Sequence, residues 1–451
     1  MRYNEMAGIF RQGRRAPSPA GRRTILVMKV TTAGAGAARG LRLPALWAVW
    51  LVTRVNLYLV ATAPHLDGDI GIYQRWYDCC LSHGSVPAAD PMWQYPPGAV
   101  LAFWLPGRLP GGYVRGFVLL AIGCDLVTAL LLCSRARRGG SMAGAWYWVC
   151  GVPLLGAVTV TRFDMVAVAL SVAALGLAGQ GRARGALIGA GGAVKAWPLL
   201  LLAGTAPGRW RRDLAAAAAV LAAACALFPS AAASFVAHQA ARGVEVESVA
   251  ATPFMLWRLA GWPGTVAYRF GAMQLSGGDV VFAQDACRLG LVLAGAMVLG
   301  WRWRLAARPA GWLPEFAADA PLAATLLFLV ASPVLSPQYL LWAIGIAAAC
   351  LATGRTTQRP VAVAVLAAAG LTQLVFPIWW PALLSGSAAV TAVLAGRNLL
   401  LTAAAVLSWR QILRAAPGDG GRGTHTELTH NPRAVLRSAA QDGPRRHHPW
   451  G

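Results

Sequence analysis

Long apolar runs alternate with short polar segments along most of the chain. A run of about 20 apolar residues is long enough to cross the hydrocarbon core of a bilayer as a helix. The pattern predicts about 12 transmembrane helices, with about 10 or 11 as alternatives. The expected segments are residues 43–62, 97–110, 114–133, 142–160, 163–180, 185–204, 213–229, 280–300, 318–334, 338–353, 360–377 and 388–409.

The predicted fold class is therefore all-α, a polytopic protein of the cell membrane. We expect a single transmembrane domain over residues 41–410. Residues 1–40 and 411–451 are rich in Arg and show no long apolar period, which is typical of disordered segments. They are predicted to be two basic tails on the cytoplasmic side, so that function lies between them.

Composition supports a membrane protein, because 57% of the residues are hydrophobic and 13% are charged. The net charge of +23 is a property that many nucleic-acid-binding proteins share. Here, however, the Arg residues form short clusters between apolar runs and in the tails, where they match anionic lipid headgroups. We therefore expect membrane lipids as partners and no nucleic acid.

The segment 63–95 follows the first expected span, which begins after a basic N-terminal segment. The positive-inside rule keeps that basic segment in the cytoplasm, and it therefore predicts that residues 63–95 are extracytoplasmic. In the C-terminal half, the basic segments also alternate consistently with the expected spans. The middle does not, since the spans alternate there only if some of the Arg clusters 135–138, 182–184 and 209–212 lie outside. Either one or two segments are re-entrant or broken, or an external cluster contacts a lipid phosphate.

The first extracytoplasmic loop, 67–98, is polar, aromatic and rich in carboxylates. Asp69, Tyr73, Trp76 and Cys80 recur at helical spacing, which predicts an interfacial helix that presents a carboxylate beside aromatic rings. The alternative is that Asp67 and Asp69 only cap this helix. The loop closes with a second aromatic segment, in which Trp93 and Tyr95 are expected at headgroup level and two prolines stiffen the re-entry, Pro96 and Pro97.

Charges inside apolar runs are costly and normally face a cavity or a partner. Asp285 and Arg288 are three residues apart and are expected to pair with each other. Arg162, Asp164 and Lys195 are candidates for binding an anionic headgroup, although an internal ion pair between Asp164 and Lys195 explains them equally well. The same class of intramembrane charge includes Asp125.

Two further stretches of the chain are predicted to be extracytoplasmic. In residues 238–250, Arg242, Glu245 and Glu247 precede Ser248. In residues 332–342, Ser336 and Pro337 suggest a proline turn that opens a helix, with Ser336 as the cap. Neither spacing matches a metal site, and no metal is expected.

These short motifs, taken in order, resemble the glycosyltransferases of the GT-C fold that use polyprenyl-phosphate sugars, and specifically family 87, the actinobacterial α-(1→2)-mannosyltransferase-like group. The resemblance covers about residues 43 to 409 and leaves out both tails. The motifs that carry it are Asp69-x-x-x-Tyr73-x-x-Trp76, Gly84-x-x-Pro87-x-x-Asp90-x-x-Trp93-Gln94-Tyr95-Pro96-Pro97, Arg162-Phe-Asp164, Lys195-x-Trp-Pro198, Glu247-Ser248 and Ser336-Pro337-Gln338-Tyr339.

The resemblance implies an enzyme that moves a sugar, mannose above all, from a polyprenyl monophosphate to a glycolipid or glycan on the extracytoplasmic face. It implies Asp69 as general base in a single inverting displacement, with Asp67 as the alternative, and no cofactor beyond the lipid-linked donor. The residues expected to bind the donor phosphate or substrate are Arg162, Asp164, Lys195, Arg242, Glu247, Gln338 and Tyr339, and the loop scaffold is Tyr73, Trp76, Tyr95, Pro96 and Pro97.

Two other functions remain as alternatives. A secondary transporter also has many spans with buried charges, but it is expected to show two related halves with interrupted helices in matching positions. The sequence shows no such symmetry. A lipid flippase or a noncatalytic protein of envelope assembly is the other alternative, and it predicts that Asp69 is dispensable.

Overall fold

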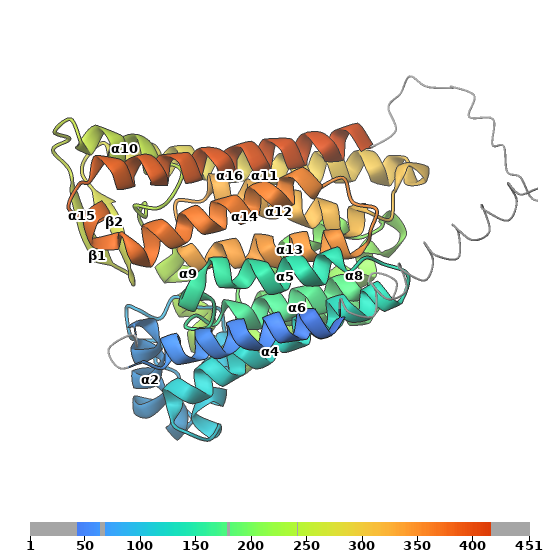
Figure 1. Cartoon of the computed structure of the whole chain (residues 1–451), viewed down its shortest axis with the longest axis horizontal. Helices are drawn as coiled ribbons and strands as arrows, with labels where there is room; N and C mark the ends of the chain where they lie inside the picture. The colour runs from blue at the N-terminus through green and yellow to red at the C-terminus, as the bar shows by residue number, and fades with distance from the viewer. Residues whose placement is uncertain (1–42, 64–67, 178–180, 241, 416–451) are drawn as a thin grey trace, which may run out of the picture.

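The computed structural model describes residues 43–63, 68–177, 181–240 and 242–415. Nearly all of the two expected tails, and also Asp67, lie outside the described residues. The described chain is mostly helical and forms an elongated bundle (Figure 1). This agrees with the predicted multi-pass membrane protein.

Five of the described helices are long and apolar enough to cross a membrane. They combine high hydropathy with lengths of 19 to 28 residues. A sixth candidate is the pair α8 (Trp210–Leu227) and α9 (Pro229–Ala240), whose axes differ by 104°. The five are the first helix (Leu43–Ala61), α4 (Tyr113–Arg137), α11 (Val280–Ala307), α14 with the turn that follows it (Arg359–Ile378) and α16 (Ala388–Ala415).

The interior of the bundle is made of shorter apolar helices. In Figure 1, α13 lies between α14 on one side and α5 with α6 on the other, and it packs against all three and against α12. Irregular backbone interrupts these helices, which membranes tolerate where it lines a cavity. Their bounds are α5 (Ala143–Leu154), α6 (Asp164–Gly176), α7 (Gly181–Val194), α12 (Phe316–Ala331) and α13 (Leu340–Ala352), joined by the 3-10 segments η3 (Gly156–Thr159), η4 (Trp197–Gly204) and η7 (Pro337–Tyr339).

Two of the expected spans are wrong in form. The segment 97–110 is not one long helix but the six-residue α3 (Ala99–Trp104) followed by η2 (Leu105–Arg108). Six helical residues rise only about 9 Å, so α3 is too short to cross the hydrocarbon core. The segment 185–204 reverses direction at Lys195. Arg184 at the start of α7 donates a hydrogen bond to the Leu201 carbonyl near the end of η4, which shows that the two ends of the segment lie side by side.

This reversal removes the conflict over the three Arg clusters. Arg184 Nη1 donates to Asp213 Oδ2 at 2.5 Å, which joins the start of α7 to the start of α8. Arg135, Arg138 and Arg209 line a common cavity. The clusters 135–138, 182–184 and 209–212 therefore lie at one end of the bundle, so none of them needs to be on the other side.

The opposite end of the bundle carries short helices and a hairpin, at the left of Figure 1. Strands β1 (Thr265–Arg269) and β2 (Ala272–Ser276) pair antiparallel through the two-residue turn Phe270–Gly271. Both turn residues have positive φ, 51° and 76°, as a type I′ turn requires. The prediction of an all-α fold is therefore wrong for this hairpin, although the rest of the described chain is helical or irregular. The short helices at this end are α2 (Gly68–Cys79), η1 (Leu81–His83), α10 (Thr252–Arg258) and α15 (Trp380–Leu384).

Candidate functional site

A cavity of about 290 Å³ opens among the short elements at this end. Its walls come from α2, the loop before α3, the segment before α6, the break after α7, α9, the hairpin turn, α11, α12 and the segment that leads into α13. It brings together ten of the predicted site residues from segments far apart in sequence. These are Asp69, Tyr73, Trp76, Tyr95, Pro96, Arg162, Lys195, Arg242, Gln338 and Tyr339.

Helix α2 presents Asp69 to the cavity. The spacing of Asp69, Tyr73 and Trp76 predicts this helix, and the structure confirms it. Tyr73 and Trp76 are buried beneath it. The Tyr73 hydroxyl donates to Asp69 Oδ2 at 3.5 Å, and Trp76 Nε1 donates to Asp90 Oδ2 at 2.7 Å. Asp69 lies in the first turn of α2, where a carboxylate also interacts favourably with the helix dipole.

The aromatic residues of the loop form a packed cluster rather than an interfacial belt. Trp93 is completely buried, with its ring centroid 5.1 Å from that of Trp76 and 5.7 Å from that of Phe103. Trp93 therefore contacts other side chains of the protein and not lipid headgroups. Edge-to-face packing of this kind is favourable for aromatic rings, and here it holds α2 against α3.

Arg162 forms an ion pair with Asp69 across the cavity. It belongs to the short irregular segment between η3 and α6. Burial lowers the pKa of Arg162 to about 10, although nearby acidic groups, Asp164 first, act to raise it. The guanidinium is still cationic at neutral pH, so the pair carries one charge of each sign.

Asp164 and Lys195 form the internal ion pair that the sequence left as an alternative. Lys195 Nζ donates to both carboxylate oxygens, at 2.7 and 2.8 Å, and Trp342 Nε1 donates to Asp164 Oδ1 at 2.6 Å. Asp164 is buried behind the cavity wall, whereas Lys195 lines the cavity. Asp164 therefore orients the ammonium group rather than facing the cavity itself.

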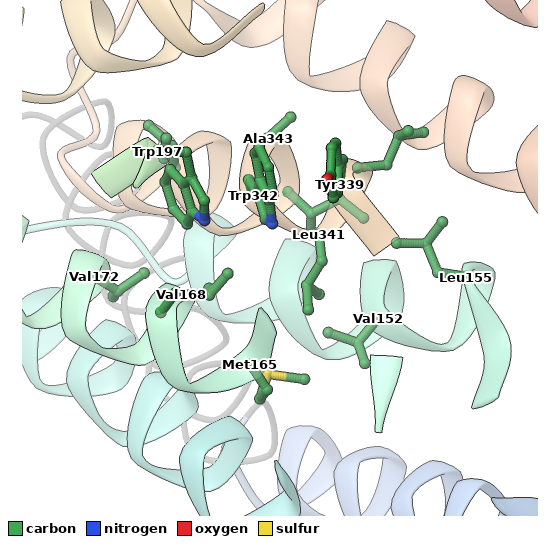
Figure 2. Packing of buried hydrophobic residues seen from close by; sticks show 14 of the residues in the cluster. Val152, Leu155, Met165, Val168, Val172, Trp197, Tyr339, Leu341, Trp342 and Ala343 are labelled. Carbon is green, nitrogen blue, oxygen red and sulfur yellow. The ribbon is translucent and has the colours of Figure 1, made fainter. Parts of the chain in front are cut away.

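An aromatic row supports the ammonium group of Lys195. Figure 2 shows Trp197, Trp342 and Tyr339 side by side with their rings roughly parallel. The ring centroids of Trp342 and Tyr339 are 4.0 Å apart. Lys195 Nζ lies 4.9 Å from the Tyr339 centroid and 4.6 Å from that of Phe163, within the range of cation–π attraction. The row thus stabilises a partly buried cation in the wall of the cavity.

Arg242 is the third cation on the wall. It pairs with Glu245 at 2.5 Å, and Ser336 Oγ donates to the other carboxylate oxygen of Glu245 at 3.0 Å. The predicted proline turn at 336–339 is present as η7, with Ser336 in the cap position. Its hydroxyl, however, makes no capping hydrogen bond, because it is turned toward Glu245.

Glu247 does not line the main cavity. It lines a neighbouring pocket of about 60 Å³ that shares Arg162 and Gln338 with the main one, and it pairs with Arg397 at 3.3 Å. Burial raises the pKa of Glu247 to about 8, although Arg397 opposes the shift. Pro97 also lies outside the main cavity lining, as does Asp164.

The sequence did not identify the part of the site contributed by the hairpin and α9. Gln94 Nε2 donates to the Phe270 carbonyl in the hairpin turn at 2.6 Å, and Gln239 Nε2 of α9 donates to the Gln94 carbonyl at 3.0 Å. Phe270 and Gln239 both line the cavity. Two features of the sequence could have indicated this part of the site: the Gln94 within the aromatic motif and the Phe270–Gly271 turn.

An apolar groove of about 570 Å³ adjoins the cavity. Leu291 of α11 and Phe328 of α12 line both spaces. Beyond them the groove runs between η4, α11 and α12 along mostly aliphatic side chains, including Leu199, Leu202, Val298 and Leu299. The polar cavity therefore borders an apolar surface of the bundle.

Two further charged pairs lie outside the cavity. Asp285 and Arg288 pair at 2.8 Å on the exposed side of α11, as predicted. Asp125 is paired with Arg54 inside the bundle at 2.8 Å. Across the described parts of the chain there is no group of three or more His, Cys, Asp or Glu side chains that could hold a metal ion.

The fold and the site define a multi-pass membrane protein with a polar, charged cavity at one end of a helical bundle. The model of glycosyltransferase family 87 matches residues 93–333, more than half of the chain. The chain belongs to this family and is a membrane glycosyltransferase, with a sugar donor and an acceptor as its substrates. The match includes Arg162, Lys195 and Arg242 but begins after Asp69. No curated protein and no solved structure matches the chain.

Proposed function

We propose that this glycosyltransferase moves a sugar, with mannose as the first candidate, from a polyprenyl monophosphate to a glycolipid or glycan acceptor on the extracytoplasmic face. The observation that carries the proposal is the cavity in which Asp69 lies opposite Arg162, close to two further cations, Lys195 and Arg242. A carboxylate and a positive wall are the two parts that this transfer requires.

Asp69 is the general base in this mechanism. Its carboxylate takes the proton of the acceptor hydroxyl as that oxygen attacks the anomeric carbon. A single displacement inverts the anomeric centre, so a β-linked donor gives an α-linked product. Asp67 lies outside the described residues and remains the alternative base, two positions earlier in the chain.

The donor phosphate is a singly charged diester that leaves as a more highly charged monoester. Fixed positive charge stabilises this increase without a general acid. Arg162 is bound to Asp69 in the absence of substrate. In the proposed mechanism, the donor phosphate attracts Arg162, and this releases the Asp69 carboxylate for proton abstraction.

The groove bounded by Leu291 and Phe328 supports a lipid-linked donor. A soluble sugar nucleotide has no group that needs an aliphatic surface of this size, whereas a polyprenyl chain loses water-exposed apolar area when it lies there. The phosphate at the cavity floor and the chain in the groove form one continuous substrate.

The distribution of Arg residues supports the extracytoplasmic location. The clusters 135–138, 182–184 and 209–212 lie at the end of the bundle away from the cavity. Under the positive-inside rule, that end faces the cytoplasm, and both tails are expected on the same side of the membrane. The cavity then faces the compartment in which polyprenyl-phosphate sugars are used.

The experiment that tests the function uses the purified full chain in lipid with a panel of polyprenyl-phosphate sugars and a glycolipid and glycan extract that supplies the acceptor hydroxyls. We expect one donor to be consumed, and Asp69→Asn to lower its transfer rate by about 100-fold or more, the usual contribution of a general base. Asp78→Asn is the matched control, because Asp78 lies on the exposed side of the same helix and outside the cavity. Full activity of Asp69→Asn would disprove the assignment of the base, and no consumption of any lipid-linked donor would disprove the donor class.

A further inference from the structure

A second large cavity lies at the other end of the bundle. Its volume is about 580 Å³, and the ends of α4, α6 and α13 and the start of α12 contribute to it. The inner wall is mostly aliphatic and includes Leu131, Leu132, Val172 and Leu175. No step of the proposed glycosyl transfer uses this space.

The mouth of this cavity is basic. It leads into an outer chamber of about 250 Å³ that shares Arg135 and Arg138 with it and adds Arg355. Within the described ranges, none of these three guanidinium groups has a carboxylate partner. One carboxylate, that of Glu315, lines the outer chamber.

The mouth is held in place by backbone contacts rather than by a free loop. Gly139 turns the chain after α4 with φ of 95°, a conformation that favours glycine. The Ser141 amide then donates to the Ala352 carbonyl at the end of α13 at 3.0 Å, and the Gly140 amide donates to the Arg135 carbonyl at 3.2 Å. The Arg side chains therefore project from a fixed rim.

We propose that this cavity binds an anionic glycerophospholipid, with its phosphate among Arg135, Arg138 and Arg355 and part of an acyl chain against the aliphatic wall. Arg binds phosphate oxygens through paired N–H donors, and the excess of positive charge at the rim disfavours a zwitterionic headgroup. An aliphatic chamber behind a phosphate site is expected for a lipid and has no use for a free phosphate ester. The proposal does not depend on the identity of the sugar donor.

Native mass spectrometry of the full chain in detergent tests the proposal, with phosphatidylglycerol and phosphatidylcholine of equal chain length as competing probes. We expect preferential retention of phosphatidylglycerol. The double variant Arg135→Gln/Arg138→Gln is expected to weaken that retention by about tenfold or more. Arg137→Gln is the matched control, because Arg137 is exposed on the same helix turn and lines neither cavity.

Two further measurements separate a lipid from a soluble phosphate. Ala173→Phe, which places a ring in the aliphatic chamber, is expected to reduce retention while all Arg residues remain. An equal concentration of glycerol 3-phosphate is expected not to displace the lipid. Equal retention of both lipids, unchanged retention in the double variant, or full displacement by glycerol 3-phosphate would each overturn the proposal. Thermal unfolding of every variant verifies that it is folded.

Discussion

The charged side chains in the apolar body are arranged as pairs that cross between distant segments. Arg54 contacts both carboxylate oxygens of Asp125, 71 positions further along the chain, and Lys195 does the same with Asp164. A buried ion that loses its partner is strongly destabilising. Asp69 differs from these buried carboxylates because it pairs at a cavity wall, where a substrate can replace its partner.

Glu247 is expected to make the free energy of unfolding depend on pH. Because burial raises its pKa from 4.5 to about 8, the folded protein keeps a proton that the unfolded chain loses. The free energy of unfolding is therefore expected to fall as pH rises from about 4.5 to about 8. Glu247→Gln is expected to remove much of this decline, an effect on the order of a few kcal/mol, measured by thermal unfolding in detergent across that range.

The control for this measurement is Glu315→Gln, at a carboxylate on the opposite end of the bundle. An identical profile for wild type and Glu247→Gln would show that the proton is not held at Glu247.

At the scale of elements, close helix packing depends on glycine where α7 meets α8. Gly185 and Gly189 are one helical turn apart, and a Cβ at Gly189 would lie 2.6 Å from the Ala217 carbonyl oxygen. Small residues with this spacing allow membrane helices to approach closely. The contact positions α7, whose last residues lead directly to Lys195.

Gly189→Leu is expected to separate α7 from α8 and to lower the stability of the protein by about 1–3 kcal/mol. Thermal unfolding in detergent measures the change. The matched control is Gly300→Leu on α11, because a side chain there meets open space. Equal effects of the two substitutions would contradict the role assigned to the contact.

The whole molecule has two different ends. One end carries α2 and the hairpin (Figure 1). The polar cavity lies at this end, and the clustered Arg residues lie at the other. A chain inserted under the positive-inside rule keeps the second end in the cytoplasm. Catalysis and the proposed phospholipid site would then lie on opposite faces of the membrane.

Cysteine labelling tests this orientation. In a background with Cys79→Ser and Cys80→Ser, we expect Ser85→Cys to react with a membrane-impermeant maleimide in intact cells. Arg137→Cys, at the exposed end of α4, is expected to react only after permeabilisation. The reverse pattern would show that the molecule is inserted with the cavity toward the cytoplasm.

The amino-acid sequence alone was enough to predict the membrane class, the helix that carries Asp69, the four charged residues that line the cavity and the resemblance to family 87. These follow from composition, helical period and ordered motifs, which are local properties of the chain. The three-dimensional fold was needed to establish that the chain reverses at Lys195, that Arg162 pairs with Asp69, and that Trp93 is buried. The hairpin over the cavity also required it. These features depend on packing between distant segments, and a linear pattern of apolar and charged residues does not specify which distant segments meet.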